Sequence, residues 1–567
     1  MLGGGQVGLV SATCLASRGH DVTCLDVVPA VVARINAGDP HIHERGLPEL
    51  VREMRSAGRL RARIAAPEAL CDSDIVILAV PTPSVDGEID LRHIKSSAQL
   101  VGAYLRGAHR YTSIVVKSTV VPGTTDTFVR QVLEDVSGIR LGAFGLGVNP
   151  EFLREGEAVK DFMHPDRIVI GYEDPETLIR LRELYASWSV ERIEVNSRTA
   201  EMIKYANNCL LATQISAVNE IANVAGAIGR IDIQNVMRGV HLDRRWNPMA
   251  ADGSRVRPAI LTYLMPGCGF GGSCLPKDAE ALRHQARLLG VKPRVLDAVL
   301  QVNADQPVQV VRLLQGSLGS LFGKRVLVLG LAFKPETDDV RDSAALAIIR
   351  HLVNHGAQVA AHDPIAVPQA QHALRSIPVE YPRVWTSALD SVDAVVVATR
   401  WPEYASLVTA ENRSKLRGKL IVDARLMFGA DQFSDTRYLS VGMGSPARAV
   451  HFPCPPLPHR EHRGQHLPDT GAPGPRDALG EDPVQTTAAR PRRPSGRRPE
   501  PLTPGVAPPK CAILLGESVQ FRSPLTGRAA ARLASSLVRF APAAVAGDDR
   551  VVVSPTASGS KAPFQGP

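Results

Sequence analysis

The chain has 567 residues, of which 44% are hydrophobic and 22% charged, a composition typical of a globular protein with several domains. Its formal net charge of +8 is concentrated in residues 445–567, where 16 Lys and Arg oppose 9 Asp and Glu, so the first 444 residues carry only +1. This balance argues against a nucleic-acid surface, and the lack of an uninterrupted run of about 18 apolar residues argues against a membrane partner.

The N-terminal sequence lacks the basic start and the small-residue cleavage site of a signal peptide. The cysteines are scattered along the chain, and their spacing matches neither a disulfide framework nor a zinc motif: Cys14, Cys24, Cys71, Cys209, Cys268, Cys274, Cys454 and Cys511. We therefore expect a cytoplasmic protein that holds no metal.

A glycine-rich turn opens the chain. The stretch "GGGQVG" matches G-x-G-x-x-G through Gly3, Gly5 and Gly8, a helical stretch follows, and the strand "HDVTCLDV" contains Asp26. In dinucleotide-binding folds these glycines let the backbone approach pyrophosphate, and the acid binds a ribose hydroxyl. Further strands at "SDIVILAVPTP" and "TSIVVKSTVVPGTT" predict a first α/β sheet that binds a dinucleotide. A glycine-rich turn in another kind of α/β protein is the alternative.

The strand that normally precedes such a turn is missing from the sequence, because only Met1 and Leu2 stand before Gly3. This strand is central in a doubly wound sheet, so its absence should expose both neighbouring strands and weaken the cofactor crevice. We interpret the pattern as a misplaced start site or a truncated chain.

The middle of the chain predicts a long helix and a second sheet. Residues 198–229 contain no Pro and keep helical apolar spacing, which predicts a helix connecting two domains. A strand and glycine turn in 320–335, a helix from about Ser343 and the strands "AQVAAHDP", "DAVVVAT" and "KLIVDAR" predict a second open parallel sheet. We expect an α/β protein with two Rossmann-like doubly wound parallel sheets joined by a long central helix.

The composition changes after about residue 444. Residues 445–567 hold 21 of the 43 prolines, with Arg-rich runs such as "RPRRPSGRRPEP". Segments of this kind bury too little apolar surface to offset the entropy of ordering, so we expect a disordered Pro/Arg-rich tail. The expected domains are 1–195, 196–305 and 306–444, followed by this tail.

A cysteine stands in an unusual setting in "PGCGFGGSCLPKD". The small residues before Cys274 let a ligand approach the backbone closely, and a thiol in such a turn can ionise and attack a carbonyl carbon. A packed, structural cysteine is the alternative interpretation.

Two pairs of polar residues four positions apart are further candidates. Glu151 and Glu155 lie in "NPEFLREGEAVKDF", where the internal Pro and Phe favour a loop facing a cleft over a solvated helix face. Lys204 and Asn208 lie on the predicted long helix and can stabilise an alkoxide, unless that helix face is simply exposed. Thr119 ends a predicted strand, where ligands gather in such folds.

Taken in order, these stretches resemble the UDP-glucose/GDP-mannose dehydrogenase family over about residues 3–443. The motifs are "GGGQVGLV", "VPTP", "KSTVVPGTT", "NPEFLREG", "PDRIVIG", "EMIKYANN", "GFGGSCLPKD" and "AFKPETDDVRDS". The resemblance implies an NAD-dependent enzyme that oxidises the C6 alcohol of a nucleotide sugar twice, to a carboxylate, through a thiohemiacetal and a thioester on Cys274. Asp26 at the end of the fingerprint favours NAD over NADP.

The resemblance also implies roles for matching positions. The implied catalytic residues are Cys274, Lys204, Asn208, Asp278, Glu151, Glu155 and Thr119. The implied cofactor-binding residues are Gly3, Gly5, Gly8, Asp26, Thr82, Thr119, Glu155, Lys277 and Arg341. The implied substrate-binding residues are Glu151, Phe152, Leu153, Lys204, Asn208, Phe270, Gly271, Phe333, Lys334 and Arg425.

The resemblance leaves the sugar and one substrate contact open. UDP-glucose is the expected substrate, with a UDP-N-acetylhexosamine, GDP-mannose, or a truncated non-catalytic relic as alternatives. A homodimer is implied, in which an arginine reaches the partner's substrate, and both Arg255 and Arg257 are candidates.

Overall fold

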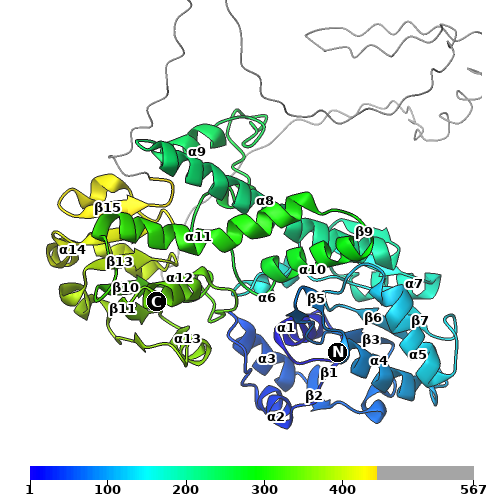
Figure 1. Cartoon of the computed structure of the whole chain (residues 1–567). Helices are drawn as coiled ribbons and strands as arrows, with labels where there is room; N and C mark the ends of the chain where they lie inside the picture. Colours follow the sequence, from blue (N-terminus) through cyan, green and yellow to red (C-terminus); the bar gives the residue numbers. More distant parts are fainter. Residues whose placement is uncertain (444–567) are drawn as a thin grey trace, which may run out of the picture. The chain divides into compact units, whose positions relative to one another are not determined.

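A 32-residue helix, α8 (Ser197–Ile228), connects two β-sheets in the computed structural model, which describes residues 1–443 (Figure 1). All described residues belong to one compact unit. The helix begins where the Asn196 side chain accepts a hydrogen bond from the Thr199 N–H (2.9 Å), and it ends before Gly229, whose φ of +77° no ordinary helix residue adopts. This confirms the long helix predicted from residues 198–229.

The first sheet contains the strands nearest the N-terminus. Their bounds are β1 Val22–Asp26, β2 Leu60–Ile64, β3 Ile75–Leu78, β6 Ser113–Val116, β7 Gly145–Val148, β8 Ile168–Tyr172 and β9 Arg192–Val195. The order is β3-β6-β7-β8-β9, and β1 pairs with β2. All pairs are parallel except β7–β8, which is antiparallel. Residues 149–167 return to the sheet at the same end at which β7 leaves it, so β8 runs in the opposite direction.

Met1 and Leu2 lie between β1 and β3, where a central strand is expected. Leu2 forms parallel bridges to both Leu25 and Leu78. The Leu25 N–H donates to the Met1 carbonyl (2.7 Å), and both leucines beside Leu2 are fully buried. Val22, Thr23 and Ile75 at the start of these strands are half-buried, as is Asp26 at the end of β1, whereas the residues between them are buried, so the exposure expected from a missing strand is limited to the strand ends.

Helices cover both faces of the first sheet. They are α1 Gln6–Ser17, α2 Pro29–Ala37, α3 Leu47–Ser56, α4 Arg92–Leu105, α5 Arg130–Ser137, α6 Ala158–Met163 and α7 Pro175–Leu184. Alternate residues of β3 enter opposite cores, since Ile77 packs with α1 and α3 while Val76 and Leu78 pack with α4 and α5. Short elements complete this part: η1 Pro67–Leu70, β4 Ser84–Val85, β5 Glu88–Ile89 and the π-helical turn η2 Thr124–Val129.

The second sheet is parallel throughout, with the order β12-β11-β10-β13-β14-β15. Its strands are β10 Arg325–Leu329, β11 Gln358–His362, β12 Val379–Glu380, β13 Ala394–Val397, β14 Leu420–Asp423 and β15 Arg437–Ser440. The accompanying helices are α12 Ala344–Asn354, α13 Val367–Ala373 and α14 Ala410–Leu416, with turns η4 Trp385–Ser387, η5 Leu389–Ser391, η6 Pro402–Val408 and η7 Ala430–Phe433. The predicted second sheet and the α/β class are therefore confirmed.

The central region consists of α8 and the helices that pack on it. These are α9 Ile233–His241, α10 Leu275–Leu288 and α11 Arg294–Leu318, with the short turn η3 Ala259–Thr262. Both α10 and α11 pack directly against α8, and α11 also packs against α12 and β14 of the second sheet. The predicted domain limits remain predictions. Helix α11 continues across the limit predicted between residues 305 and 306.

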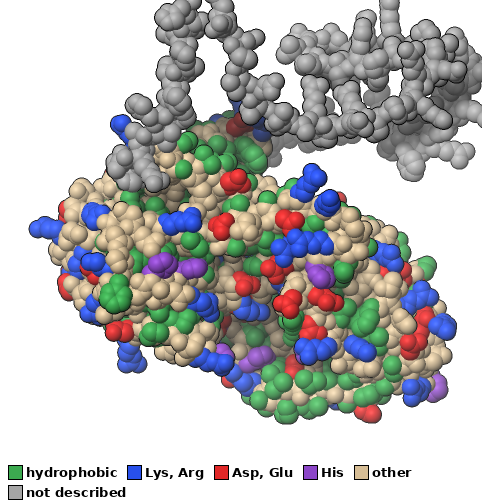
Figure 2. Space-filling view, viewed as in Figure 1, with side chains coloured by type: hydrophobic (Ala, Val, Ile, Leu, Met, Phe, Trp, Pro, Cys, Tyr) green, Lys and Arg blue, Asp and Glu red, His purple; other side chains and the backbone are tan. Residues whose placement is uncertain are grey.

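Within residues 1–443, no helix combines the length and hydrophobicity needed to cross a membrane. On the face shown in Figure 2, basic and acidic side chains are interspersed, as the near-neutral charge of the first 444 residues predicts. The predicted tail at 445–567 lies outside the described residues.

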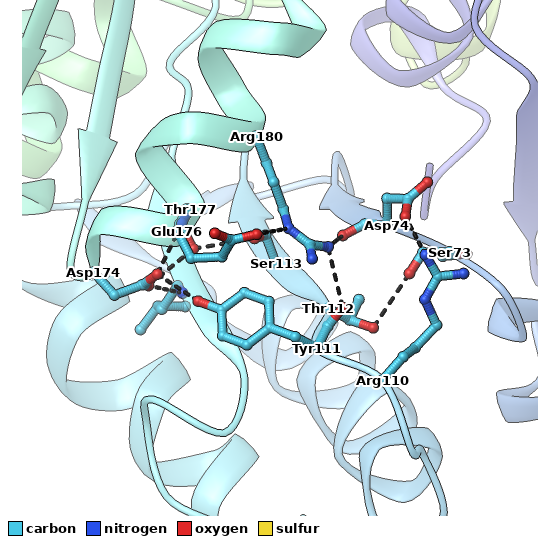
Figure 3. Close-up of polar contacts among 11 residues, drawn as sticks. Ser73, Asp74, Arg110, Tyr111, Thr112, Ser113, Asp174, Glu176, Thr177 and Arg180 are labelled. Carbon is cyan, nitrogen blue, oxygen red and sulfur yellow. Dashed lines mark hydrogen bonds and ion pairs between the residues drawn. The ribbon is translucent and has the colours of Figure 1, made fainter.

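A polar cluster joins α7 to the first sheet (Figure 3). The Asp174 carboxylate caps α7 by accepting the Thr177 N–H (2.8 Å), and it also accepts the Leu146 N–H (3.0 Å) and the Tyr111 hydroxyl. Arg180 extends the cluster by donating to the Tyr111 carbonyl (3.1 Å). The cluster lies near the amino ends of β6 and β7, whereas the candidate site residues follow the carboxyl ends of these strands.

We predict that Asp174→Ala lowers the free energy of unfolding by about 3 kcal/mol, because it removes a helix cap and leaves buried donors unpaired. Urea unfolding followed by circular dichroism measures this change. The matched control is Glu176→Ala on the same helix, which removes only a partly exposed i,i+4 pair with Arg180 and should cost less than about 1 kcal/mol. Equal losses in the two variants would contradict the assigned role of Asp174.

Candidate active site

A cavity of about 610 Å³ lies between the 149–168 segment, α8 and the glycine-rich loop before α10. Most of the residues expected from the sequence to meet the substrate or perform chemistry line it: Glu151, Phe152, Leu153, Glu155, Lys204, Asn208, Gly271, Cys274, Phe333 and Lys334. These residues come from segments up to about 180 positions apart, so the cavity is a product of the tertiary structure.

A buried ion pair forms one wall of the cavity. The Lys204 Nζ lies 2.8 Å from the Glu151 Oε1, and both side chains are about 95% buried. Burial opposes the charge on Lys204, but attraction from Glu151, Cys274 and Asp278 raises the pKa of Lys204 above its usual value. Burial likewise opposes ionisation of Glu151, and Lys204 outweighs it, so the pKa of Glu151 is lowered. Each group therefore keeps the other charged.

A second buried group lies one turn further along α8. The Asn208 Nδ2 donates to the Asp278 Oδ2 (2.7 Å), and the Lys277 Nζ donates to the Asp278 Oδ1 (2.5 Å). Lys204 and Asn208 therefore share one buried helix face, as their i,i+4 spacing predicts. Because Asn208 uses its amide to hold Asp278, the helix and the segment after Cys274 are fixed against each other.

Cys274 lies at the N-cap position of α10, at the end of the glycine-rich loop. A side chain at Gly272 would come within 2.8 Å of the Phe333 ring, and one at Gly271 within 2.3 Å of the Asp342 carbonyl oxygen, so this close packing requires glycine. Burial, followed by repulsion from Glu151, raises the pKa of the Cys274 thiol, while Lys204 opposes the shift. The helix N-terminus also favours a thiolate at this position.

Glu155 differs electrostatically from the other carboxylates of the cavity. Its Oε1 accepts the Ser273 hydroxyl (3.0 Å) and the Arg341 guanidinium (3.3 Å). Burial, followed by repulsion from Asp339, raises the pKa of Glu155 to about 7, and Arg341 opposes the shift. A carboxyl group with this pKa can accept or release a proton near neutral pH.

The expected substrate contacts are only partly brought together. The Arg167 guanidinium carbon lies over the Phe152 ring, 4.0 Å from the ring centroid, and Lys334 lines the cavity beside Phe333. Phe270 instead lines a second cavity. Arg425 lies outside the main cavity and donates to the Gly269 carbonyl (2.8 Å), so its guanidinium supports the glycine-rich loop in this structure.

The glycine turn expected to bind the dinucleotide lies at the carboxyl ends of the parallel strands of the first sheet, the same edge at which Glu151 follows β7. Gly3 has a φ of +102°, and a side chain there would lie 2.5 Å from the Ala79 carbonyl oxygen. A side chain at Gly8 would lie 2.0 Å from the Gly3 carbonyl oxygen, whereas the position above Gly5 is open space. The chain thus packs tightly around the turn and leaves room where a pyrophosphate would approach the start of α1.

The acidic end of the crevice is ordered in the same way. The Asp26 Oδ2 accepts the Gly4 N–H (2.8 Å) and its Oδ1 accepts the Val28 N–H (2.9 Å), which place its carboxylate at the end of β1 for a ribose hydroxyl. The Thr82 hydroxyl donates to the Thr119 carbonyl (2.8 Å) and joins the two loops at the same edge of the sheet. These residues fit an NAD molecule, whose nicotinamide supplies the hydride acceptor.

Two groups of site residues were missed by the sequence analysis. Lys117 is buried, its Nζ donates to the Asn149 Oδ1 (2.7 Å), and burial lowers its pKa to about 8. The Tyr185 hydroxyl donates to the same oxygen (2.5 Å), and all three residues line the cavity. The other omission is Ser273. Lys117 and Ser273 stand inside motifs recognised from sequence, but nothing in their spacing indicates that their side chains enter the site.

Comparison with known proteins matches most of the described chain to one family. The UDP-glucose/GDP-mannose dehydrogenase family is matched by its NAD binding domain over residues 1–189, its central domain over 198–305 and its UDP binding domain over 327–430. UDP-glucose 6-dehydrogenase AglM of Haloferax volcanii is 41% identical over 433 residues, which cover 75% of this chain and 96% of that protein.

Solved structures agree with this assignment. A UDP-glucose dehydrogenase from Pyrobaculum islandicum is 40% identical with a TM-score of 0.70, and the match covers 78% of this chain and 96% of that one. A UDP-D-ManNAc dehydrogenase from Pyrococcus horikoshii is 26% identical with a TM-score of 0.67 and coverages of 78% and 98%. The chain belongs to the UDP-glucose/GDP-mannose dehydrogenase family and is an NAD-dependent dehydrogenase of UDP-sugars.

Proposed function

We propose that the chain oxidises the C6 alcohol of UDP-glucose to the carboxylate of UDP-glucuronate, with Cys274 as the nucleophile. The observation that carries this proposal is the position of the Cys274 thiol in one cavity with the Lys204–Glu151 ion pair and Asn208. A cation and an amide beside a thiol can hold the oxygen of an alcohol, an aldehyde or a thioester in turn. The UDP-glucose relatives from Haloferax and Pyrobaculum support the choice of sugar.

In the first oxidation the C6 oxygen is held by Lys204 and Asn208. The ammonium of Lys204 would stabilise the alkoxide that forms, and a bound NAD would supply the acceptor for the C6 hydrogen and its electron pair. The hydroxyl proton passes to a carboxylate of the site. The two candidates are Asp278, which is hydrogen-bonded to Asn208, and Glu151, which is paired with Lys204. The product of this step is an aldehyde that remains in the cavity.

In the second oxidation Cys274 captures that aldehyde. The thiol gives up its proton as the sulfur bonds to C6 and the carbonyl π electrons move to oxygen. The oxygen of this thiohemiacetal anion would re-form the carbonyl as a second NAD took the C6 hydride, which gives a thioester. Water, positioned by Glu151, Glu155 or Thr119, attacks the thioester carbon and the sulfur departs. The acyl group leaves as a carboxylate, so each sugar consumes two NAD and one water.

The second sheet is the proposed binding site of the UDP group. Lys334 follows β10 and lines the cavity beside Phe333, so its ammonium can bind diphosphate oxygens. Arg425 belongs to the same sheet and would have to exchange its bond with the Gly269 carbonyl to take part. The similar structure from Pyrococcus horikoshii is named as a UDP-D-ManNAc dehydrogenase. A UDP-N-acetylhexosamine is therefore the second candidate substrate.

A non-catalytic relic is the alternative from another class of function. The missing first strand is the feature that suggests a relic. However, Leu2 forms bridges to the strands on both sides of the expected position. All proposed catalytic side chains are present, and the turn at Gly3 keeps its tight packing. These observations favour an active enzyme.

The proposed homodimer is supported by exposed apolar side chains on α8. Leu210 is 64% exposed, Val224 55% and Ile221 50%, although a helix of this composition normally buries such residues. In the nearby segment after α9, the Arg255 guanidinium donates to the Leu242 carbonyl (2.9 Å) and so braces its own loop. Arg257 is exposed and its backbone φ is +47°, so we assign the cross-subunit contact to Arg257.

The thiol mechanism predicts a stoichiometry of two NADH per UDP-glucose for the parent enzyme, measured by absorbance at limiting sugar. Cys274→Ala should abolish this turnover, because no thiohemiacetal can form. The matched control is Cys71→Ala, an exposed cysteine remote from the cavity, which should leave the rate unchanged. One NADH per sugar, or full turnover by Cys274→Ala, would refute the thioester route.

The cross-subunit assignment predicts that Arg257→Ala raises the KM for UDP-glucose about 10- to 100-fold, the loss of one charged hydrogen bond. Arg244→Ala, another exposed arginine of the same segment, is the control and should leave KM near the parent value. Mixing Arg257→Ala with Cys274→Ala subunits should restore activity at low UDP-glucose, since the mixed dimer has one complete site. No restoration in a verified mixed dimer would place the arginine in its own subunit's site or in none.

A further inference from the structure

The site contains three carboxylates near Cys274, and two of them are already committed to other groups. Glu151 is held ionised by Lys204, and both oxygens of Asp278 accept hydrogen bonds, from Asn208 and Lys277. Neither carboxylate is hydrogen-bonded to the Cys274 sulfur, whose side-chain hydrogen-bond partner within residues 1–443 is Ser273, so neither is placed to take the thiol proton directly.

Glu155 is the uncommitted carboxylate of the three. Its Oε2 is buried and accepts no hydrogen bond within residues 1–443, and Arg341, its one ionic partner, is shared with Asp339. Its pKa of about 7 matches the pH at which a base must take up and release protons in every turnover.

Ser273 connects this carboxylate to the thiol. Its Oγ donates to the Glu155 Oε1 at 3.0 Å and lies 3.5 Å from the Cys274 Sγ, within hydrogen-bond range for sulfur. A hydroxyl can accept a proton on one side while it donates its own on the other. The three side chains therefore form a continuous path from sulfur to carboxylate.

We propose that Ser273 relays the proton of the Cys274 thiol to Glu155 as the sulfur attacks the aldehyde. The S–C6 bond forms, the thiol proton moves to the Ser273 oxygen, and the Ser273 proton moves to Glu155. When water later cleaves the thioester, the departing sulfur recovers the proton from Glu155 by the reverse path. The proposal rests on the proposed role of Cys274 and adds a positioning residue to it.

The other charged groups near this path do not replace it. The groups that act on the Cys274 sulfur are Glu151, Lys204, Asp278 and Arg341. The groups that act on Glu155 are Asp339, Arg341 and Lys334. Lys204 on α8 stabilises the thiolate, and Arg341 stabilises the ionised Glu155. Neither cation can accept a proton.

The test is a single turnover of the C6 aldehyde of UDP-glucose with NAD, followed by NADH absorbance between pH 6 and 9. The parent rate should rise with pH through about 7, because Glu155 must be ionised before it can accept the thiol proton. Ser273→Ala should be about 100-fold slower and lose this rise, the usual effect of removing a proton-transfer group. Ser273→Thr keeps the hydroxyl and should restore both the rate and the pH dependence.

Glu155→Gln provides the second variant. It should lose the same pH dependence as Ser273→Ala, and the double variant should be no slower than either single one, because both changes interrupt one path. A Ser273→Ala enzyme with the parent's rate and pH profile, or a double variant slowed by the product of the two single effects, would overturn the relay.

A readout without substrate separates this proposal from the proposed function. In the ligand-free protein, Ser273→Ala removes a donor to the thiolate, so iodoacetamide should modify the Cys274 peptide several-fold more slowly at neutral pH, and Ser273→Thr should reverse this. Unchanged modification in Ser273→Ala would count against the relay. Oxidation of the aldehyde by Cys274→Ala at the parent's rate would instead refute the nucleophile itself.

Discussion

The buried ion pair between Lys204 and Glu151 is the interaction on which the proposed active site depends. It joins α8 to the segment after β7 across 2.8 Å, with both side chains about 95% buried. Removing either partner would leave an uncompensated buried charge, which costs about 3–5 kcal/mol in proteins. The pair is thus less a source of stability than a geometric constraint. It keeps a cation at a fixed point of the cavity beside the Cys274 thiol.

The three carboxylates around that thiol are alike in sequence and different in environment. Lys204 lowers the pKa of Glu151, whereas burial and Asp339 raise the pKa of Glu155 to about 7. Opposite shifts of this kind divide the work between a charge that stabilises and a group that moves protons. In the proposed reaction, the relay through Ser273 and the fixed pair at Lys204 are therefore complementary parts of one site.

The sequence predicted most of the fold because its signals are local. Glycines with a required backbone shape mark the turn at Gly3, and helical spacing without Pro marks α8. Spacing also placed Lys204 and Asn208 on one helix face. The antiparallel pair β7–β8 was not predicted, because strand direction depends on how residues 149–167 return to the sheet. The contact of Leu2 with strands on both sides was hidden for the same reason, since two residues carry no periodicity.

By itself, the sequence determined the α/β class and the glycine turn for the dinucleotide, and it singled out the cysteine proposed as nucleophile, because each depends on residues adjacent in the chain. Only the tertiary structure decided which carboxylate is paired and which is available as a base, and that Lys117 and Ser273 belong to the cavity at all. Burial and the distances between charges set a pKa, and both arise when segments far apart in the chain pack together.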